Sequence, residues 1–392
     1  MPPTYDRTMS VVPRDARRRW AVVVAVLAVL VAIPLVVRAL PAHTPPIPPD
    51  TLAARIAASA RQPYQGYAVS IGNAGLPSLP QLDDVIGLFD GNTSLRIWYG
   101  DPTRWRVDTI DAAGERDLYQ SGLYQTIWDY GRNQLTDILG VASVRLPRGA
   151  DLAPPDLARR LLSAASAPDL AGAAGSSRKS LPARRVAGID AAGLRLIPTS
   201  AQTTVASVDI WADPTTGLPL EVDVSARGVA KPVLVTRLLS VSLTAPATTA
   251  TMPHTAPPGA GHTVTSNPDV LSALRNLGLG SLPDSLGGLA RNGNGLGALP
   301  GLAAYGTGFR QVVAANVPRR TGFDAIRAAR NVGGTVNRFP GGTDVIVTTP
   351  LLSVVITASN LTRNVYIVVG LVGEDVLAAA GVELATFVGG DE

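Results

Sequence analysis

Residues 207–224 read SVDIWADPTTGLPLEVDV, and this stretch decides the fold of the segment around it. Val208 and Ile210 alternate with polar or bulky neighbours, which is the period-two pattern of a strand with one apolar face. The DPTTG sequence at 213–217 is typical of a turn. The stretch therefore predicts two strands joined by a turn, at 203–212 and 218–225.

Short strands of the same kind are predicted on both sides of this pair, separated by Gly, Pro and Asn. The further strands are predicted at 66–72, 93–100, 103–110, 115–120, 123–130, 133–139, 184–190, 193–197 and 231–243. Helices are predicted at about 51–61, with Asp50 as N-cap, and at about 155–165. Strands that follow one another without helices between them form antiparallel sheets. We therefore expect a mainly β domain over residues 50–245.

The remainder of the chain divides into a linker and a smaller domain. Residues 246–308 are rich first in Pro, Thr and Ala and then in Gly, Leu and Asn, which predicts a low-complexity linker. An α+β domain is expected over 309–392. Its strands are predicted at 309–315, 334–339, 343–348, 352–358 and 365–371, and its helices at 322–331 and 373–380.

An uncharged apolar run extends from Trp20 to Val37 behind a cluster of arginines. At ~1.5 Å per residue it spans about 27 Å, close to the hydrocarbon core of a bilayer. The arginines predict a cytoplasmic N-terminus at 1–19, a transmembrane helix at 20–40 and a Pro-rich spacer at 41–49 outside the cytoplasm. The alternative is a cleaved signal peptide, whose apolar core is usually shorter, ~7–15 residues. Both interpretations export the domains.

Composition excludes several kinds of site. With 0 Cys there are no disulfides, thiolate metal ligands or Cys nucleophiles. His43, His254 and His262 all fall in the predicted spacer and linker, and no nucleophile-elbow, P-loop or zinc-protease motif is present. The net charge of +4 comes from the N-terminal arginines, and no basic run follows residue 40. We therefore expect no enzyme, catalytic residue, cofactor, metal site or nucleic-acid partner.

Aromatic residues gather in the larger domain, which holds four of the five Trp. Alternation along the predicted strands places one set of apolar side chains on one face of the sheet. An ordinary packed core would explain them. A hollow for a ligand is the functional interpretation, because the predicted helices are Ala-rich and offer little bulk. The residues predicted to line the hollow are Leu95, Ile97, Tyr99, Trp105, Val107, Val208 and Ile210. The loop over 75–91 is predicted to form its lid or mouth, with Leu79, Leu82, Ile86 and Phe89.

Several stretches together resemble a known superfamily. They are GYAVSIG (66–72), RIWYGDPTRWRVD (96–108), ERDLYQSGLYQTIWDYGRNQLT (115–136), PDLARRLLSA (155–164) and SVDIWADPTTGLPLEVDV (207–224). Their order resembles the LolA/LolB lipoprotein-carrier superfamily. The most similar branch is the actinobacterial one related to RseB/MucB, the regulator of the extracytoplasmic stress sigma factor. The resemblance covers about residues 50–245.

The resemblance implies an antiparallel half-barrel wrapped around short helices, with an apolar cavity for lipid or lipoprotein acyl chains. It also implies a smaller C-terminal domain and, as partner, a membrane anti-sigma factor. Classical carriers are soluble and periplasmic, whereas this chain has the predicted anchor. We therefore expect a single-pass membrane protein with most of its chain extracytoplasmic, which binds lipid or lipoprotein acyl chains. The alternative is an RseB/MucB-like regulator that binds an anti-sigma factor or another membrane protein.

Overall fold

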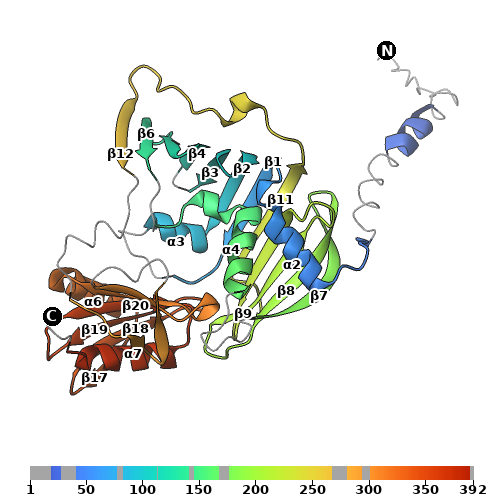
Figure 1. The fold of residues 1–392 in the computed structure, drawn as a ribbon. Helices are drawn as coiled ribbons and strands as arrows, with labels where there is room; N and C mark the ends of the chain where they lie inside the picture. The colour runs from blue at the N-terminus through green and yellow to red at the C-terminus, as the bar shows by residue number, and fades with distance from the viewer. Residues whose placement is uncertain are drawn as a thin grey trace, which may run out of the picture. The chain divides into compact units, whose positions relative to one another are not determined.

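The computed structural model describes residues 19–27, 41–76, 83–112, 114–140, 145–166, 176–266, 280–293 and 301–388 (Figure 1). Contacts divide the chain into two units, Met1–His43 and Thr44–Glu392. In the first unit residues 19–27 are helical. Among the described residues, no helix combines the length and the apolar character needed to cross a bilayer. Residues 28–40 of the predicted anchor lie outside the described residues.

The second unit is mainly β, as predicted. Its larger sheet has 12 strands in the order β12-β6-β5-β4-β3-β2-β1-β11-β10-β9-β8-β7. Neighbours pair antiparallel, except that β12 and β6 are parallel. The strands are β1 (Tyr64–Gly72), β2 (Asn92–Asp101), β3 (Arg104–Asp111), β4 (Gly114–Ser121), β5 (Tyr124–Asp129), β6 (Gln134–Leu139), β7 (Ser176–Val186), β8 (Ile189–Pro198), β9 (Val205–Ala212), β10 (Pro219–Ala226), β11 (Leu234–Ser242) and β12 (Gly261–Ser266).

Two helices cover one face of this sheet, here called the helix-side face. Helix α2 (Pro49–Ala58), which continues into η1 (Ser59–Arg61), packs on β7 and β8, and α4 (Pro154–Ser166) packs on β8, β10 and β11. Both helices are amphipathic, and Ile56 and Leu162 are buried in the main core. The opposite face is called the far face.

The DPTTG turn docks on α2. Asp213 accepts hydrogen bonds from the backbone N–H groups of Thr215 (3.1 Å) and Thr216 (3.3 Å), which fixes the turn. Gly217 has a φ of +73°, and a Cβ there would lie 2.3 Å from the carbonyl oxygen of Arg55. Glycine is required for both reasons. The most specific motif of the sequence is therefore a structural turn that joins β9 and β10 to a helix.

The structure differs from the predicted elements in several places. Helix α2 begins at Pro49 with Pro48 at the N-cap position, so Asp50 lies in the first turn and is not the N-cap. The predicted strand 184–190 contains the β7–β8 turn, where Ala187 (φ +49°) and Gly188 (φ +83°) both take left-handed conformations. Helix α3 (Asp83–Phe89) forms within the predicted loop 75–91. The predicted linker 246–308 contains the short helix η3 (Thr248–Thr251) and strands β12 to β15. The Gly- and Pro-rich composition of this segment hides these short strands, of which β12 pairs with the distant strand β6.

The C-terminal part forms an 8-stranded sheet in the order β13-β14-β15-β16-β20-β19-β18-β17. Adjacent residues of its strands belong to two different cores, Ile346 to the core under α7 and Val345 to the core under α6. The two helices therefore cover opposite faces. The elements are β13 (Ser285–Leu286), β14 (Leu289–Asn292), β15 (Leu302–Tyr305), η4 (Gly308–Arg310), β16 (Val312–Val317), α6 (Arg319–Asn331), β17 (Thr335–Phe339), β18 (Gly342–Thr348), β19 (Ser353–Ser359), β20 (Val365–Gly370) and α7 (Glu374–Thr386).

Candidate functional site

The residues predicted to line a hollow all lie on the helix-side face. Ile97 pairs with Val107 and Tyr99 with Trp105 across β2 and β3, so these four side chains share one face. Five of the seven residues are 0–4% exposed and belong to the core that also contains α2 and α4: Leu95, Ile97, Val107, Val208 and Ile210. Tyr99 and Trp105 are only partly buried. Helix side chains therefore contact the same face as the predicted lining.

The predicted lid is described in part. Leu79 and Leu82 lie outside the described residues. Ile86 and Phe89 lie on α3 and are partly buried, and Phe89 packs against the main core. The backbone N–H of Ala74 donates to the carbonyl oxygen of Phe89 (3.1 Å), which ties the end of α3 to the chain that leaves β1.

The face of the larger sheet that is buried differs between its two ends. Over β8 to β11 the helix-side residues form the core. On β4 and β5 the far-face residues Tyr119 and Trp128 are buried, whereas the helix-side residues Gln120, Gln125 and Ile127 are only partly buried. Helices α2 and α4 pack on β7, β8, β10 and β11 instead of on this end. Val107, Leu118 and Ile138 are buried on the helix-side face of this end, and η2 (Gly149–Leu152) packs on β3. Only the part of this face around Trp105, Gln120, Gln125 and Ile127 is therefore partly accessible.

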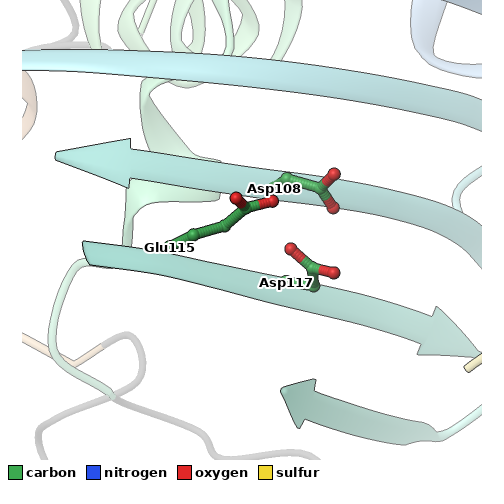
Figure 2. A group of neighbouring side chains, drawn as sticks. All are labelled: Asp108, Glu115 and Asp117. Atoms are coloured by element: carbon green, nitrogen blue, oxygen red, sulfur yellow. The ribbon is translucent and has the colours of Figure 1, made fainter. Parts of the chain in front are cut away.

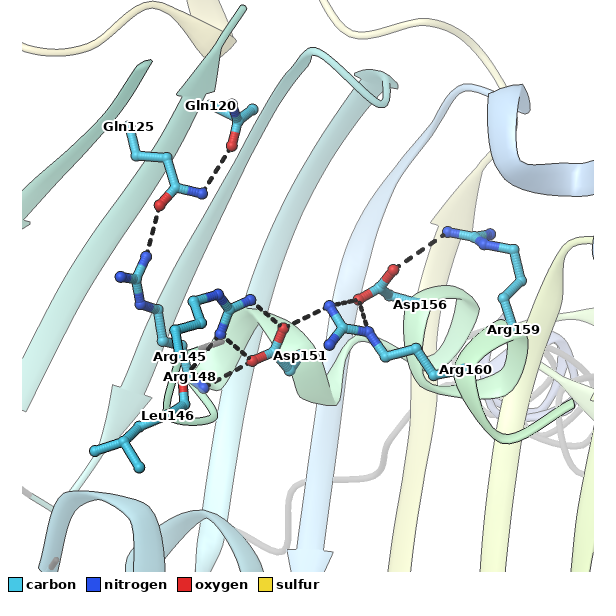
Figure 3. A network of polar contacts seen from close by, with 9 residues as sticks. All are labelled: Gln120, Gln125, Arg145, Leu146, Arg148, Asp151, Asp156, Arg159 and Arg160. Carbon is cyan, nitrogen blue, oxygen red and sulfur yellow. Dashed lines mark hydrogen bonds and ion pairs between the residues drawn. The ribbon is translucent and has the colours of Figure 1, made fainter. Parts of the chain in front are cut away.

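Four arginines gather beside this accessible end. Figure 3 shows a chain of polar contacts that runs from Gln120 and Gln125 through the segment 145–151 to the first turns of α4. We call Arg145, Arg148, Arg159 and Arg160 the arginine cluster. Asp151 accepts hydrogen bonds from both terminal nitrogens of Arg145 (2.7 Å each) and from Arg160 (2.8 Å). Asp156 accepts from Arg160 (Nε, 2.9 Å) and lies 3.7 Å from Nη2 of Arg159.

Arg148 differs from the other three arginines because its side chain bonds to a neutral group. Its Nη1 donates to Oε1 of Gln125 (2.6 Å), whose Nε2 donates to Oε1 of Gln120 (2.8 Å). Burial, together with repulsion from Arg145, lowers the pKa of Arg148. By contrast, burial alone would raise the pKa of Asp151, but the hydrogen bonds and charge of Arg145 hold it below its usual range. The charge of Arg148 is thus the least compensated in the cluster.

The far face holds a different charged group. Figure 2 shows the carboxylates of Asp108, Glu115 and Asp117 turned toward one another from β3 and β4, with one oxygen of each within 4.8 Å of the others. Arg106 donates to Asp108 (Nε, 2.5 Å) and to Asp117 (Nη2, 2.8 Å), and Arg96 pairs with Glu115. Guanidinium groups therefore already neutralise much of this cluster, and a metal ion would have to compete with them.

The predicted linker helps to bury this far-face cluster. Segment 248–254 crosses β2 and β3, where the hydroxyl of Thr251 accepts a bond from Arg104 (3.5 Å) and His254 lies edge-on to the ring of Tyr119 (5.8 Å). His262 lies 2.8 Å from Asp137 on β6. A groove of about 350 Å³ opens nearby on the far face, beside Tyr67, Trp98 and Ser240. It lies on the opposite side of the sheet from the predicted hollow.

The arginine cluster is not apparent in the sequence. It forms no basic run, because its members come from the segment before η2 and from α4 and are brought together only by the fold. The alternation that placed Trp105 on the helix-side face also places Gln120 and Gln125 there, since the three residues pair across β3, β4 and β5. The alternation along each strand was a signal available in the sequence, whereas the register across the strands was not.

Comparison with solved structures finds proteins of the kind that the sequence motifs resemble. MucB in complex with the periplasmic part of MucA is 16% identical with a TM-score of 0.46, and the match covers 85% of this chain and 97% of that chain. MucB alone is 14% identical with a TM-score of 0.40, covering 85% and 96%. A LolA-superfamily protein from Nitrosomonas europaea is 9% identical with a TM-score of 0.24, covering 53% and 99%.

No family model and no curated protein sequence matches the chain. The solved structures that match include MucB and a LolA-superfamily protein.

Proposed function

We propose that this chain is a membrane-anchored extracytoplasmic binding protein that holds an acyl chain of a lipid or lipoprotein against the helix-side face of β3 to β6. The observation that carries the proposal is the partial exposure of two apolar side chains on a face that elsewhere forms the core. Trp105 and Ile127 lie on that face and are partly buried, and the buried Leu118 lies beside them. Covering such side chains with a CH₂ chain gains about 0.8 kcal/mol per methylene.

The position of the helices supports this placement. Leu157 and Leu161 form a partly exposed stripe on α4 beside its fully buried stripe. Tyr99 is held by a bond from its hydroxyl to the carbonyl oxygen of Ala60 (2.6 Å) and stacks on Tyr64 at 5.4 Å. The ring of Tyr99 is therefore fixed, and an acyl chain would meet a preorganised surface there.

Uptake of a fluorescent fatty acid by the detergent-free unit Thr44–Glu392 tests the proposal. Ile127→Glu places a charge on the accessible helix-side face and is expected to reduce uptake at least about tenfold, because an acyl chain cannot solvate a carboxylate. Tyr124→Glu is the matched control, since Tyr124 is exposed and lies on the other face of the same strand. Equal uptake by the two variants, or no uptake by the unsubstituted unit, would contradict the proposal.

A second candidate function is binding of an anti-sigma factor or another membrane protein. The favouring observation is β12, which adds to the edge strand β6 although all six of its residues are exposed. An edge that accepts this weakly packed strand can accept an extended peptide in its place. Replacing residues 261–266 by Gly and Ser should then strengthen binding of a purified anti-sigma extracytoplasmic segment. Unchanged binding or its complete absence would argue against this site.

A further inference from the structure

We propose that Arg148, with Gln125 and Gln120, binds the phosphate-type anionic headgroup of the amphiphile whose acyl chain lies on β3 to β6. This inference rests on the proposed function and names the chemical class of its ligand.

Gln120, Gln125 and Arg148 form a hydrogen-bonded row, here called the polar row, that presents N–H donors. Gln125 uses its Oε1 to accept from Arg148 and its Nε2 to donate to Gln120, and Gln120 donates from Nε2 to the carbonyl oxygen of Gly122 (2.7 Å). These bonds fix the orientation of both amides. The remaining N–H groups of the Arg148 guanidinium have no protein acceptor among the described residues. A planar guanidinium with free N–H groups matches two oxygens of one phosphate.

The charge balance favours an anion. The cluster contains four arginines against two aspartates, and both aspartates are engaged by Arg145, Arg159 and Arg160. Arg148 is therefore left with a neutral amide as its partner, while its main chain donates to Asp151 (2.8 Å). Burial and the neighbouring Arg145 disfavour its charge, as the lowered pKa reflects. A bound anion would relieve that unfavourable energy.

The headgroup position continues directly from the apolar surface. Trp105, Gln120 and Gln125 are successive partners across β3, β4 and β5, and the adjacent row on the same face contains Leu118 and Ile127. Adjacent same-face rows of a sheet are ~7 Å apart, so a headgroup at Arg148 places the first methylenes of its chain over Ile127. The backbone at Gly149 packs closely on Thr109, where a Cβ would lie 2.3 Å from the hydroxyl, and this fixes the segment that carries Arg148.

Calorimetric titration of the unit Thr44–Glu392 with dodecyl phosphate, dodecyl maltoside and inorganic phosphate tests the inference. The unit is compact and contains all three hydrophobic cores. We expect dodecyl phosphate to bind about tenfold more tightly than dodecyl maltoside, because a charge-assisted hydrogen bond contributes on that scale. Arg148→Gln should remove this preference and leave dodecyl maltoside unaffected. Arg148→Lys should restore part of it, and Arg237→Gln, at an exposed far-face position on β11, should change neither affinity.

Each outcome separates the two proposals. If neither amphiphile binds, the proposed function fails together with the headgroup site. If both bind equally to the unsubstituted unit, or Arg148→Gln keeps the preference, acyl binding stands and the headgroup site is overturned. If inorganic phosphate binds as tightly as dodecyl phosphate, the ligand is a free anion and the headgroup assignment is overturned. A thermal unfolding scan of each variant confirms that it is folded.

Discussion

Asp108 is the buried residue whose titration bears most directly on stability. Burial, followed by repulsion from Asp117, raises its pKa to about 7 in spite of the hydrogen bond from Arg106. The pKa of an Asp side chain in an unfolded chain is ~3.9. The folded state therefore binds this proton more tightly, and the associated stability is fully present below pH ~4 and is lost as the pH rises through about 7.

Asp108→Asn removes this titration. The Tm of the variant minus that of the unsubstituted protein should therefore increase between pH 4 and pH 7.5, measured by thermal unfolding at fixed ionic strength. Asp101→Asn serves as the control, because a hydrogen bond from the hydroxyl of Thr103 lowers the pKa of Asp101. The stability linked to Asp101 is present above its unfolded pKa of ~3.9 and lost below it, so the Tm difference of this variant should not increase between pH 4 and pH 7.5. Slopes of the same sign in both variants would refute the assignment.

Substitutions of Asp151 and of Arg148, which lie close together at the arginine cluster, are expected to have contrasting effects on the free energy of unfolding. Asp151→Asn should lower the free energy of unfolding by about 2–3 kcal/mol, since Arg145, Arg160 and the main chain of Arg148 lose a charged acceptor. Arg148→Gln should change it by less than about 0.5 kcal/mol without ligand, because it removes a poorly compensated charge. Urea denaturation measures both, and a large loss for Arg148→Gln would show a structural role.

At the scale of elements, the turn between β9 and β10 joins these two strands and also packs against helix α2. A side chain at Gly217 would require both a positive φ and displacement of the Arg55 carbonyl. Gly217→Ala should therefore cost about 3 kcal/mol or more of unfolding free energy. Gly188→Ala has a similar φ of +83° but no atom within 4 Å, so it should cost only about 1 kcal/mol. Equal losses would mean that the contact with α2 adds nothing.

At the scale of the whole molecule, stability should be unevenly distributed along the larger sheet. Its strands β9 and β10 are almost entirely buried, whereas every residue of the terminal strand β12 is exposed, Val264 by 57%. Amides in 261–266 should therefore exchange hydrogen at least about 100-fold faster than those in 208–212. Mass spectrometry of exchanged peptides measures this ratio, and comparable protection would show that β12 belongs to the cooperative core.

The sequence predicted most strands because their apolar periodicity is local. Val208 and Ile210 were placed on a buried face, and their pairing partners on β10 follow directly after a recognisable turn. It failed where the local apolar signal is weak. Strand β7 is largely polar and exposed, so no alternation marked it, and β12 to β14 lie in segments whose Gly and Pro content resembles a linker.

The amino-acid sequence by itself determined the mainly β class and the shared face of Ile97, Tyr99, Trp105 and Val107, because these depend on periodicity within single strands. Only the tertiary structure decided which part of that face the helices fill and which part stays accessible. It alone also gathered the arginines of the segment before η2 and of α4 beside Gln125. The physical reason is that burial and charge compensation depend on neighbours distant in sequence, which no local pattern specifies.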